Sequence, residues 1–591
     1  MMISTDLRVP GPRRHAVVVS TIAMLLAATF AHARPLSVVP EEPGTPNWVD
    51  GTPILARLFP NPVTPPRLPS APAQNVAPRF NIGHARNFFA FDFTNSKQYV
   101  APATLRAVGD FCYVYVEDTE WNTRVNQNAV DRTVRAFEND TPGDPSRGIY
   151  QIEVDAFGPP PDIDGDPRVV LLLLDIRDNF RPPTGSFVAG YFTSVNQQAG
   201  NVRDPRWGVT FQSNETEMVY VDVNPLDVMT NAAMGILAHE FQHLIHFGYD
   251  ASEDTWVNEG ASEFAMFLCG YSPTSHVRQF EAEPSVSLVE WPNGVGSSLP
   301  YYGSAYLWML YLYEQYGGLN TLKRIVQSPQ RGVTGVETAL NVEGFSAPIR
   351  QVVGDWRAAV AADDDTIEGG RYGIQNENLR ITSRPHLAYP VSQRTSSLDG
   401  WAGHFLEFRS PSGDPLPLQV DLAAQERWRD AFSVRALLFR SGELIDVRDV
   451  SRVPLEARFM DAFEEFGVEA TRVLLSVAFQ PSSDGETADY EYSVRLGAPV
   501  TFQVVGFRNP IQRDYVELVA LPSVPVEAGT VSGALMTQGL TLNGDMKTAD
   551  GGNSFGVSFR VPDNAMPQRE WSWVLTHFDQ VVGEGSIQLP D

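Results

Sequence analysis

The sequence predicts a multidomain α+β protein, in which a domain with a mixed β-sheet lobe and a helical lobe precedes all-β, sandwich-like domains. Its 591 residues exceed a single domain of ordinary size, and 43% of them are hydrophobic, which is enough to form substantial cores. Apolar and β-branched runs typical of strands lie between residues 88 and 223, and helical patterns continue to about residue 365. Beyond that point, short alternating runs separated by turn residues predict β-strands.

The first 33 residues have the pattern of a signal peptide. Three arginines precede an apolar run over residues 16–30, and Ala31-His32-Ala33 has the A-x-A form of a signal-peptidase site. That run is too short to span a bilayer comfortably, and no later stretch is long and apolar enough. We therefore expect a secreted protein with no integral membrane segment after signal cleavage. Its expected location is extracellular, with the bacterial periplasm or the cell surface as alternatives.

Residues 34–80 contain 12 prolines, which favour an extended chain over a packed fold. One interpretation of this segment is a linker. The other is a pro-segment that restrains the following domain before activation. Both interpretations stay open on the sequence alone.

The net charge of the chain restricts its partners. A formal charge of −27 at pH 7 repels nucleic acid and anionic lipid, so neither is expected to bind. We expect the protein to be a monomer.

The domain predicted over residues 81–366 begins with β-strands and ends with helices. The strand at 218–223 leads directly into a helix, and we expect its edge to bind an extended peptide by main-chain hydrogen bonds. The expected strands are 88–93, 110–121, 167–176 and 218–223; the expected helices are 125–139, 230–247 with its end at Gly248, one beginning near Asn258, and several between 300 and 365.

The residues with the clearest chemistry form an H-E-x-x-H sequence at 239–243. Residues four apart lie on one helix face, so His239 and His243 can each offer a ring nitrogen to one Zn²⁺ ion. Glu240 is rotated by about 100° from His239 and so flanks the metal. A general base that takes a proton from water has to lie there.

A second motif, Asn258-Glu259-Gly260-Ala261-Ser262-Glu263, follows at a distance that lets another helix return past the first. A catalytic zinc needs a third protein ligand and an open fourth position, and Glu259 is the candidate ligand. Glu259 and Glu263 are four residues apart, a spacing that weakens a helix unless one carboxylate binds a cation. Glu263 is then expected to support a ligand histidine by a hydrogen bond, and Asn258 is a second candidate for such support.

These motifs, H-E-x-x-H followed by N-E-x-x-S-E, resemble those of the thermolysin-like gluzincins. The fuller stretches HEFQHLIHF and WVNEGASEF are most similar to hyicolysin-type secreted bacterial zinc metallopeptidases, over residues 85–365. The resemblance implies a zincin-like domain that hydrolyses peptide bonds of a protein or peptide substrate. It also implies zinc bound by His239, His243 and Glu259, with Glu240 as the catalytic base.

A secreted or surface binding and adhesion protein with a catalytically silent zincin domain is the alternative. The intact Glu240 favours an enzyme, because a scaffold does not need this base. Enzymes of this kind place a Tyr or His opposite the base to donate a hydrogen bond to the developing oxyanion. Tyr302 and Tyr301 are the candidates, with His276 after them; the alternative is that these rings belong to the core.

An acidic turn at Asp162, Asp164 and Asp166 has two interpretations. One is a Ca²⁺ site in an exported enzyme, and the other is a carboxylate-rich turn before a strand. The spacing does not fit an EF-hand loop, because Leu173 stands where the bidentate Glu belongs.

Cys112 and Cys269 are the only cysteines of the chain. In an oxidising compartment they are a candidate disulfide, and two unpaired thiols are the equal alternative.

Two β domains are expected after the helical region, a sandwich-like one over residues 367–498 and a C-terminal one over residues 499–591. Neither contains a catalytic set of residues. Binding of a substrate or a cell surface, or stabilisation of the protein, are the roles expected of them.

Overall fold

A computed structural model gives the fold of this chain. The residues it describes are 38–39, 46–58, 68, 76–181, 185–204, 206, 208–292, 297–411, 416–450, 458–463, 466–497, 502–523, 526, 529, 531–537, 540–562, 565, 570–577 and 580–588. The signal peptide expected over residues 1–33 lies outside them. None of the helices in this described part combines the length and apolarity that a bilayer crossing needs.

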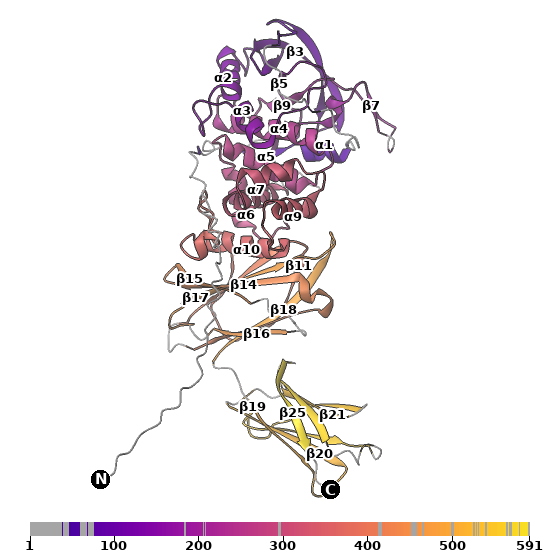
Figure 1. Ribbon diagram of the computed structural model, residues 1–591, viewed down its shortest axis with the longest axis vertical. Helices are drawn as coiled ribbons and strands as arrows, with labels where there is room; N and C mark the ends of the chain where they lie inside the picture. The colour runs from indigo at the N-terminus through magenta and orange to yellow at the C-terminus, as the bar shows by residue number, and fades with distance from the viewer. Residues whose placement is uncertain are drawn as a thin grey trace, which may run out of the picture. The chain divides into compact units, whose positions relative to one another are not determined.

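A seven-stranded mixed sheet forms the first part of the fold, with strand order β1-β6-β9-β5-β4-β3-β2 (Figure 1). β4, β5 and β9 run parallel, β6 runs antiparallel to β9, and β1 runs parallel to β6. The bounds are β1 Trp48–Asp50, β2 Ala85–Asp92, β3 Lys97–Val108, β4 Cys112–Glu117, β5 Val169–Leu174, β6 Phe187–Tyr191 and β9 Met218–Asp222; β7 Val202–Arg203 and β8 Thr210–Phe211 form a separate pair. The four expected strands are confirmed as β2, β4, β5 and β9.

Both faces of this sheet are buried. Successive residues of a strand point to opposite faces, and in β4 Val114 belongs to one hydrophobic cluster while Tyr113 and Tyr115 belong to another. The first cluster includes the apolar residues of three helices, α2 (Gln127–Glu138), α3 (Ile149–Phe157) and α4 (Asn231–Tyr249). The second includes Leu55 from the short helix α1 (Thr52–Leu58).

The helical region expected between residues 300 and 365 is confirmed, and a further helix over residues 274–282 precedes it. α5 (Thr255–Leu268) packs against both α4 and α7 (Leu299–Gln315). Gly260 permits the close approach to α7, since a β-carbon there would lie 2.9 Å from the Ala305 carbonyl oxygen. The other helices are α6 Thr274–Ala282, α8 Leu319–Val326, α9 Gly332–Val342 and α10 Ile349–Ala362.

The remaining strands form two pairs of sheets, each pair around its own hydrophobic cluster. The first pair has the orders β10-β12-β17-β14-β15 and β11-β18-β13-β16, and the second has β19-β20-β23 and β22-β21-β24-β25. The bounds are β10 Arg384–His386, β11 Val391–Asp399, β12 Gly403–Arg409, β13 Leu418–Ala424, β14 Phe432–Arg440, β15 Glu443–Asp449, β16 Arg458–Phe463, β17 Arg472–Phe479, β18 Thr487–Leu496, β19 Phe502–Arg508, β20 Tyr515–Pro522, β21 Val531–Thr537, β22 Leu540–Asp545, β23 Phe555–Arg560, β24 Glu570–His577 and β25 Gln580–Gln588.

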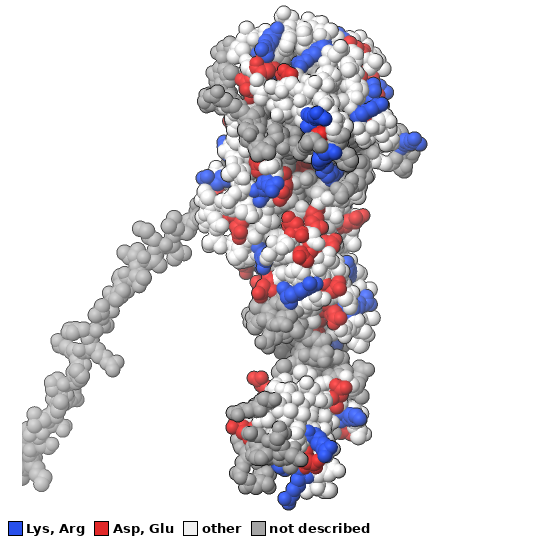
Figure 2. Space-filling view, turned by 90° about the vertical axis from the view of Figure 1, so that its right-hand side faces the viewer, with Lys and Arg blue, Asp and Glu red and all other residues white. Residues whose placement is uncertain are grey.

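Charged side chains of both signs are interspersed on the surface. On the face shown in Figure 2, the described Lys and Arg residues are scattered among Asp and Glu and form no continuous basic surface.

Three local expectations are wrong. The strand expected to be the edge of the sheet is β9, which lies inside it, because β6 and β1 from separate segments pair beyond it. α4 does not end at Gly248; it continues to Tyr249, and a β-carbon at Gly248 would lie 2.8 Å from Leu68 Cδ2 and 3.1 Å from Pro161 Cδ. α5 begins at Thr255, ahead of Asn258.

Candidate metal centre

Helix α4 places His239 and His243 next to each other in a buried position. The helix begins with the Thr230 hydroxyl accepting a hydrogen bond from Ala233 N (3.3 Å). The two imidazole Nε2 atoms are 3.1 Å apart. Because two neutral imidazoles that present lone pairs to each other repel, this geometry calls for a proton or a cation between them.

Glu259 reaches the same point from α5. Its Oε2 lies 3.3 Å from His239 Nε2, and its Oε1 lies 3.6 Å from His243 Nε2. The carboxylate is buried, and a buried carboxylate is costly unless a cation or hydrogen bonds compensate it. The structure thus brings together the three residues expected as metal ligands.

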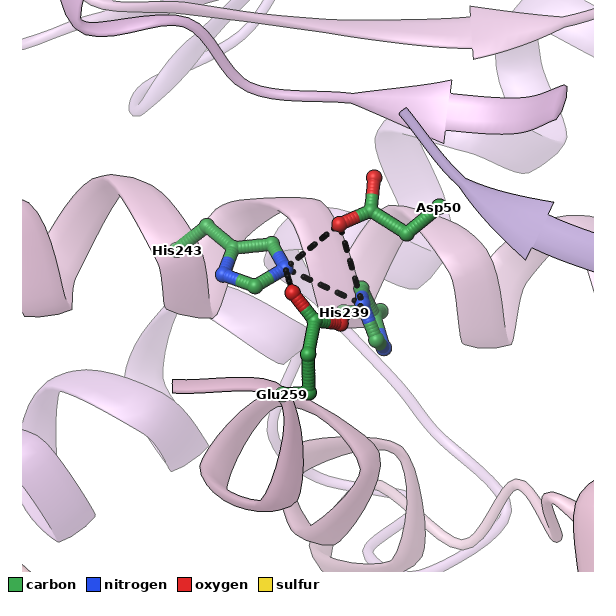
Figure 3. A group of neighbouring side chains, drawn as sticks. All are labelled: Asp50, His239, His243 and Glu259. Carbon is green, nitrogen blue, oxygen red and sulfur yellow. Dashed lines mark hydrogen bonds and ion pairs between the residues drawn. The ribbon is translucent and has the colours of Figure 1, made fainter. Parts of the chain in front are cut away.

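A fourth carboxylate, that of Asp50, completes the group, and no sequence motif marks it. Asp50 is the last residue of β1, and its Oδ2 lies 3.0 Å from His243 Nε2 and 3.8 Å from His239 Nε2. Figure 3 shows the Asp50 and Glu259 side chains approaching the two imidazoles from different elements. We refer to Asp50, His239, His243 and Glu259 as the four-residue cluster.

The spacing of the four-residue cluster fits one tetrahedral ion. Ligand atoms roughly 2.0–2.1 Å from a tetrahedral Zn²⁺ lie about 3.3 Å from one another. The separations between ligand atoms here run from 3.0 to 3.8 Å. Asp50 Oδ2 and Glu259 Oε2 are buried and have no hydrogen-bond partner among the described residues, which leaves their lone pairs for a cation. The donor set therefore fits zinc.

The charges in the cluster favour a positive centre. Burial lowers the pKa of His239, but the carboxylates of Asp50 and Glu259 outweigh it and raise that pKa to about 10. Burial raises the pKa of Asp50, but the two imidazoles hold it well below its usual range. The carboxylates thus stabilise positive charge at the place where their free oxygens meet the imidazoles.

Glu240 lies beside the cluster and is fully buried. Burial first, and then the charge of Asp50, raise its pKa well above the ordinary value. Its Oε1 has no hydrogen-bond partner among the described residues, and its Oε2 lies 3.4 Å from Thr52 Oγ1. The side chain packs against Gly190 in β6, where an added β-carbon would lie 2.7 Å from Oε1.

Hydrogen bonds hold the ligand rings unequally. His243 Nδ1 lies 3.1 Å from Asn258 Oδ1 and 3.1 Å from Ser262 Oγ. Glu263 Oε1 is 3.6 Å from His239 Nδ1 but 3.0 Å from His276 Nδ1. Asn258 is therefore in contact with a ligand ring, as expected, whereas the shorter contact of Glu263 goes to His276.

Tyr302, the expected oxyanion donor, lies next to the cluster on α7. Its hydroxyl oxygen accepts a hydrogen bond from Asp50 N (3.2 Å), and its ring stacks on His276 at 4.6 Å. Tyr302 is buried, whereas the neighbouring Tyr301 is half-buried and contacts Trp291. Both the functional and the core interpretation of Tyr302 are compatible with this position.

The acidic turn has a different composition from the one expected. Asp162 and Asp164 meet Glu217, with one carboxylate oxygen of each within 4.8 Å of the others. Asp166 is not part of this group: it pairs with Arg168 (3.1 Å) and accepts a hydrogen bond from Tyr113 Oη (2.6 Å). Glu217, the partner of this turn, immediately precedes β9 and is more than fifty positions away in the sequence. The spacing of the acidic residues in the turn gives no sign of this partner.

The disulfide considered between Cys112 and Cys269 is absent, and both cysteines are free, buried thiols. They lie in different surroundings, Cys112 beside Glu138 and Cys269 beside Glu153. Burial raises the pKa of both thiols well above the ordinary value.

Three residues at the site were not expected there: Asp50, Thr52 and Gly190. Asp50 and Thr52 stand in a proline-rich segment whose pairing partner is more than a hundred residues away, and the sequence contains no local signal for it. Gly190 had one available signal, because a glycine inside an apolar run such as FVAGY often marks a close approach.

One comparison with known proteins found a metalloprotease that is similar to part of this chain. The chain is 25% identical over 288 residues to the neutral metalloprotease ShpI of Staphylococcus hyicus, a match that covers 46% of this chain. The chain spans about 60% of the length of that relative. No family model matches the sequence.

Similar solved structures add nothing to this. The match to a β-glucuronidase of Ruminococcus gnavus spans 32% of this chain and 35% of the glucuronidase chain at 9% identity. The match to the adhesin domain of Epf from Streptococcus pyogenes spans 34% of this chain and 78% of the adhesin chain at 9% identity. Both have a TM-score of 0.13, which is too low to support a statement about fold or function. The sequence match alone supports a relation to metalloproteases in general.

Proposed function

We propose that this chain is an exported zinc-dependent endopeptidase with a zincin-like domain. The observation that carries the proposal is the convergence of two imidazoles and two carboxylates with a buried Glu240 on the same helix as the imidazoles. His239, His243 and Glu259 would hold the ion. When bound, zinc would supply Lewis acidity there: it would polarise a carbonyl and lower the pKa of a bound water toward about 7.

The residues of the chain supply the proton transfers and the orientation. Glu240 accepts the proton of the attacking water at its unpartnered Oε1 and passes it to the leaving amine. Gly190 lets the peptide backbone of β6 lie against this carboxyl group. We assign to Tyr302 the hydrogen bond to the developing oxyanion, because its hydroxyl already contacts a backbone amide next to the cluster.

Metal content and casein hydrolysis test this function together. They are measured for the wild-type chain and for Asp50→Asn, in which one carboxylate of the four-residue cluster becomes a neutral amide. Each of these two chains is tested with and without Glu240→Gln. We expect one zinc in every chain and hydrolysis that Glu240→Gln lowers by about 10²–10⁴-fold. Glu153→Gln is the matched control, because Glu153 is also a fully buried glutamate, and its carboxyl oxygens have no hydrogen-bond partner among the described residues.

Two outcomes would contradict the proposal. Absence of zinc from the wild-type chain would mean that the cluster is not a metal site. Zinc without hydrolysis in any of the chains would favour the alternative, a secreted or surface binding protein with a silent domain of this kind.

We also propose that the group Asp162, Asp164 and Glu217 binds Ca²⁺. Glu217 is 2% exposed, and while its Oε1 accepts a hydrogen bond from Ile163 N, its Oε2 has no hydrogen-bond partner among the described residues. Three carboxylates that share one place, one of them buried and half-satisfied, suit a hard cation with oxygen ligands. Calcium titration by calorimetry tests this, and Glu217→Gln should abolish binding while Glu215→Gln, an exposed neighbour, should not.

A further inference from the structure

The segment that contains Asp50 lies along the edge of the sheet beside the four-residue cluster. β1 pairs with β6 in the register Trp48↔Phe187 and Val49↔Val188, and Gly51 N donates a hydrogen bond to Gly190 O (2.9 Å). This is the way an extended peptide binds an open sheet edge. A segment of the chain itself therefore occupies the place where a substrate would pair with β6.

Asp50 is fixed so that one oxygen is left for the metal. Its Oδ1 accepts hydrogen bonds from Thr52 N (2.8 Å) and Thr52 Oγ1 (2.9 Å). Its backbone N–H donates to Tyr302 Oη (3.2 Å). With these contacts made, Oδ2 faces the two histidines and has no other partner among the described residues.

The same segment covers the other groups expected to act on a substrate. Thr52 Oγ1 lies 3.4 Å from Glu240 Oε2 and also accepts a hydrogen bond from Phe192 N. The Trp48 carbonyl oxygen lies 3.0 Å from His276 Nε2, and the Trp48 ring packs edge-on against His239. This one segment thus covers both Glu240, the expected base, and His276.

Little room remains beside the cluster. The cavity next to His243 has a volume of about 30 Å³, and Thr52, Leu55 and Ala56 form part of its lining. A cavity of that size holds about two water molecules and excludes a peptide. The site is closed because residues 46–58 fill it.

We propose that residues 46–58 are an inhibitory segment and that Asp50 is the fourth ligand of the zinc in a latent form of the enzyme. The inference rests on the proposed peptidase function. A catalytic zinc keeps three protein ligands and one open position, whereas four protein ligands make a closed site. Asp50 supplies the fourth ligand from the strand that occupies the substrate edge, so withdrawal of this one segment opens both the metal and the β6 edge.

Two substitutions separate the metal contact from the seating of the segment. Asp50→Asn keeps the side-chain shape and an acceptor for Thr52 but replaces an anionic ligand by a neutral one. Gly51→Val leaves Asp50 intact and unseats the segment, because a β-carbon at Gly51 would lie 2.5 Å from Phe93 Cζ and 3.0 Å from Tyr191 Cβ. Asp131→Asn is the control, because it makes the same Asp-to-Asn substitution on an exposed helix face.

The experiment compares the full wild-type chain with these three variants by zinc content, by casein hydrolysis, and by the visible spectrum of the Co²⁺-substituted protein with and without acetohydroxamate. Acetohydroxamate binds a metal only at a position that the protein leaves open. We expect the wild type and Asp131→Asn to bind one metal, to hydrolyse casein slowly and to show no spectral response. Asp50→Asn and Gly51→Val should respond to acetohydroxamate and hydrolyse casein at least about 10-fold faster, because loss of the metal contact and displacement of the segment each raise the fraction of sites that are open.

The possible results distinguish the inhibitory segment from the proposed function. If the wild type responds to acetohydroxamate and hydrolyses casein as fast as both variants, Asp50 does not close the site, and the peptidase function stands. If both variants respond to acetohydroxamate but none of the chains hydrolyses casein, the metal contact is correct and the peptidase function falls. If the variants bind one metal but show neither change, the inhibitory role of residues 46–58 is wrong.

Discussion

The backbone of Gly190 lies against the carboxyl group of Glu240, so close that a β-carbon on Gly190 would be 2.7 Å from Glu240 Oε1 and 2.9 Å from Ile236 Cγ2. This contact joins β6, the strand with which β1 pairs, to the residue assigned as the base. It holds the Glu240 side chain of α4 against the sheet.

Gly190→Ala should therefore displace Glu240 without removing a metal ligand. A shift of about 1 Å in a catalytic group can cost about 100-fold in rate, and we expect a loss of that order in kcat with one zinc still bound. The measurement is steady-state hydrolysis in the Asp50→Asn background. Gly235→Ala, which also adds a methyl group, within α4 against Met266 and Tyr271 rather than Glu240, is the control. Equal rates for the two variants would show that the Gly190 contact is only structural.

Glu259→Gln should weaken zinc binding more than Glu263→Gln does. Glu259 faces both ligand histidines, whereas the shorter contact of Glu263 is with His276. Loss of an outer hydrogen-bond partner typically costs about 10–100-fold in metal affinity, and loss of a direct ligand should exceed that. Competition with a chromophoric chelator measures both affinities. The ligand assignment fails if the two variants bind zinc equally well.

The group around Glu217 should make stability depend on pH and on Ca²⁺. Burial and the charge of Asp164 raise the pKa of Glu217 to about 8 in the folded chain. The folded state then binds one more proton than the unfolded state between about pH 4.5 and pH 8, so stability falls as pH rises through this window. Ca²⁺ competes with that proton, and its stabilising effect should grow toward pH 8.

Thermal unfolding between pH 5 and pH 9, with and without Ca²⁺, measures this dependence. Glu217→Gln should flatten the pH profile and remove the Ca²⁺ effect. An unchanged Ca²⁺ effect in this variant would place the cation elsewhere.

Asp355→Ala should destabilise the contact between α10 and β14. Arg435 Nε lies 3.0 Å from Asp355 Oδ1, and the two side chains are 5% and 2% exposed. Asp355→Ala removes the buried partner of Arg435 and leaves that guanidinium its contact with the exposed Asp449 (2.9 Å), so we expect a loss no larger than the about 3–5 kcal/mol typical of a broken buried pair. Denaturant titration followed by tryptophan fluorescence measures the loss. Asp446→Ala, which removes a surface partner of Arg448, should cost less than about 1 kcal/mol.

The sequence by itself determined the parts of the site that depend on local geometry. His239 and His243 share a helix face because the α-helix repeats every 3.6 residues, and Glu240 flanks them for the same reason. The pairing with Glu259 followed from a short turn between two helices, although α5 starts earlier than expected. Apolar runs predicted four strands of the sheet because buried strands are apolar throughout.

Only the tertiary structure decided what closes the site. Asp50 meets His243 across a gap of more than 190 residues, through a strand pairing that no local pattern encodes. The same holds for Glu217, which joins Asp162 and Asp164 in place of Asp166, and for the two cysteines, which lie in separate surroundings. Periodicity and capping act over a few residues, whereas the order of strands in a sheet is set by the burial of whole segments against one another.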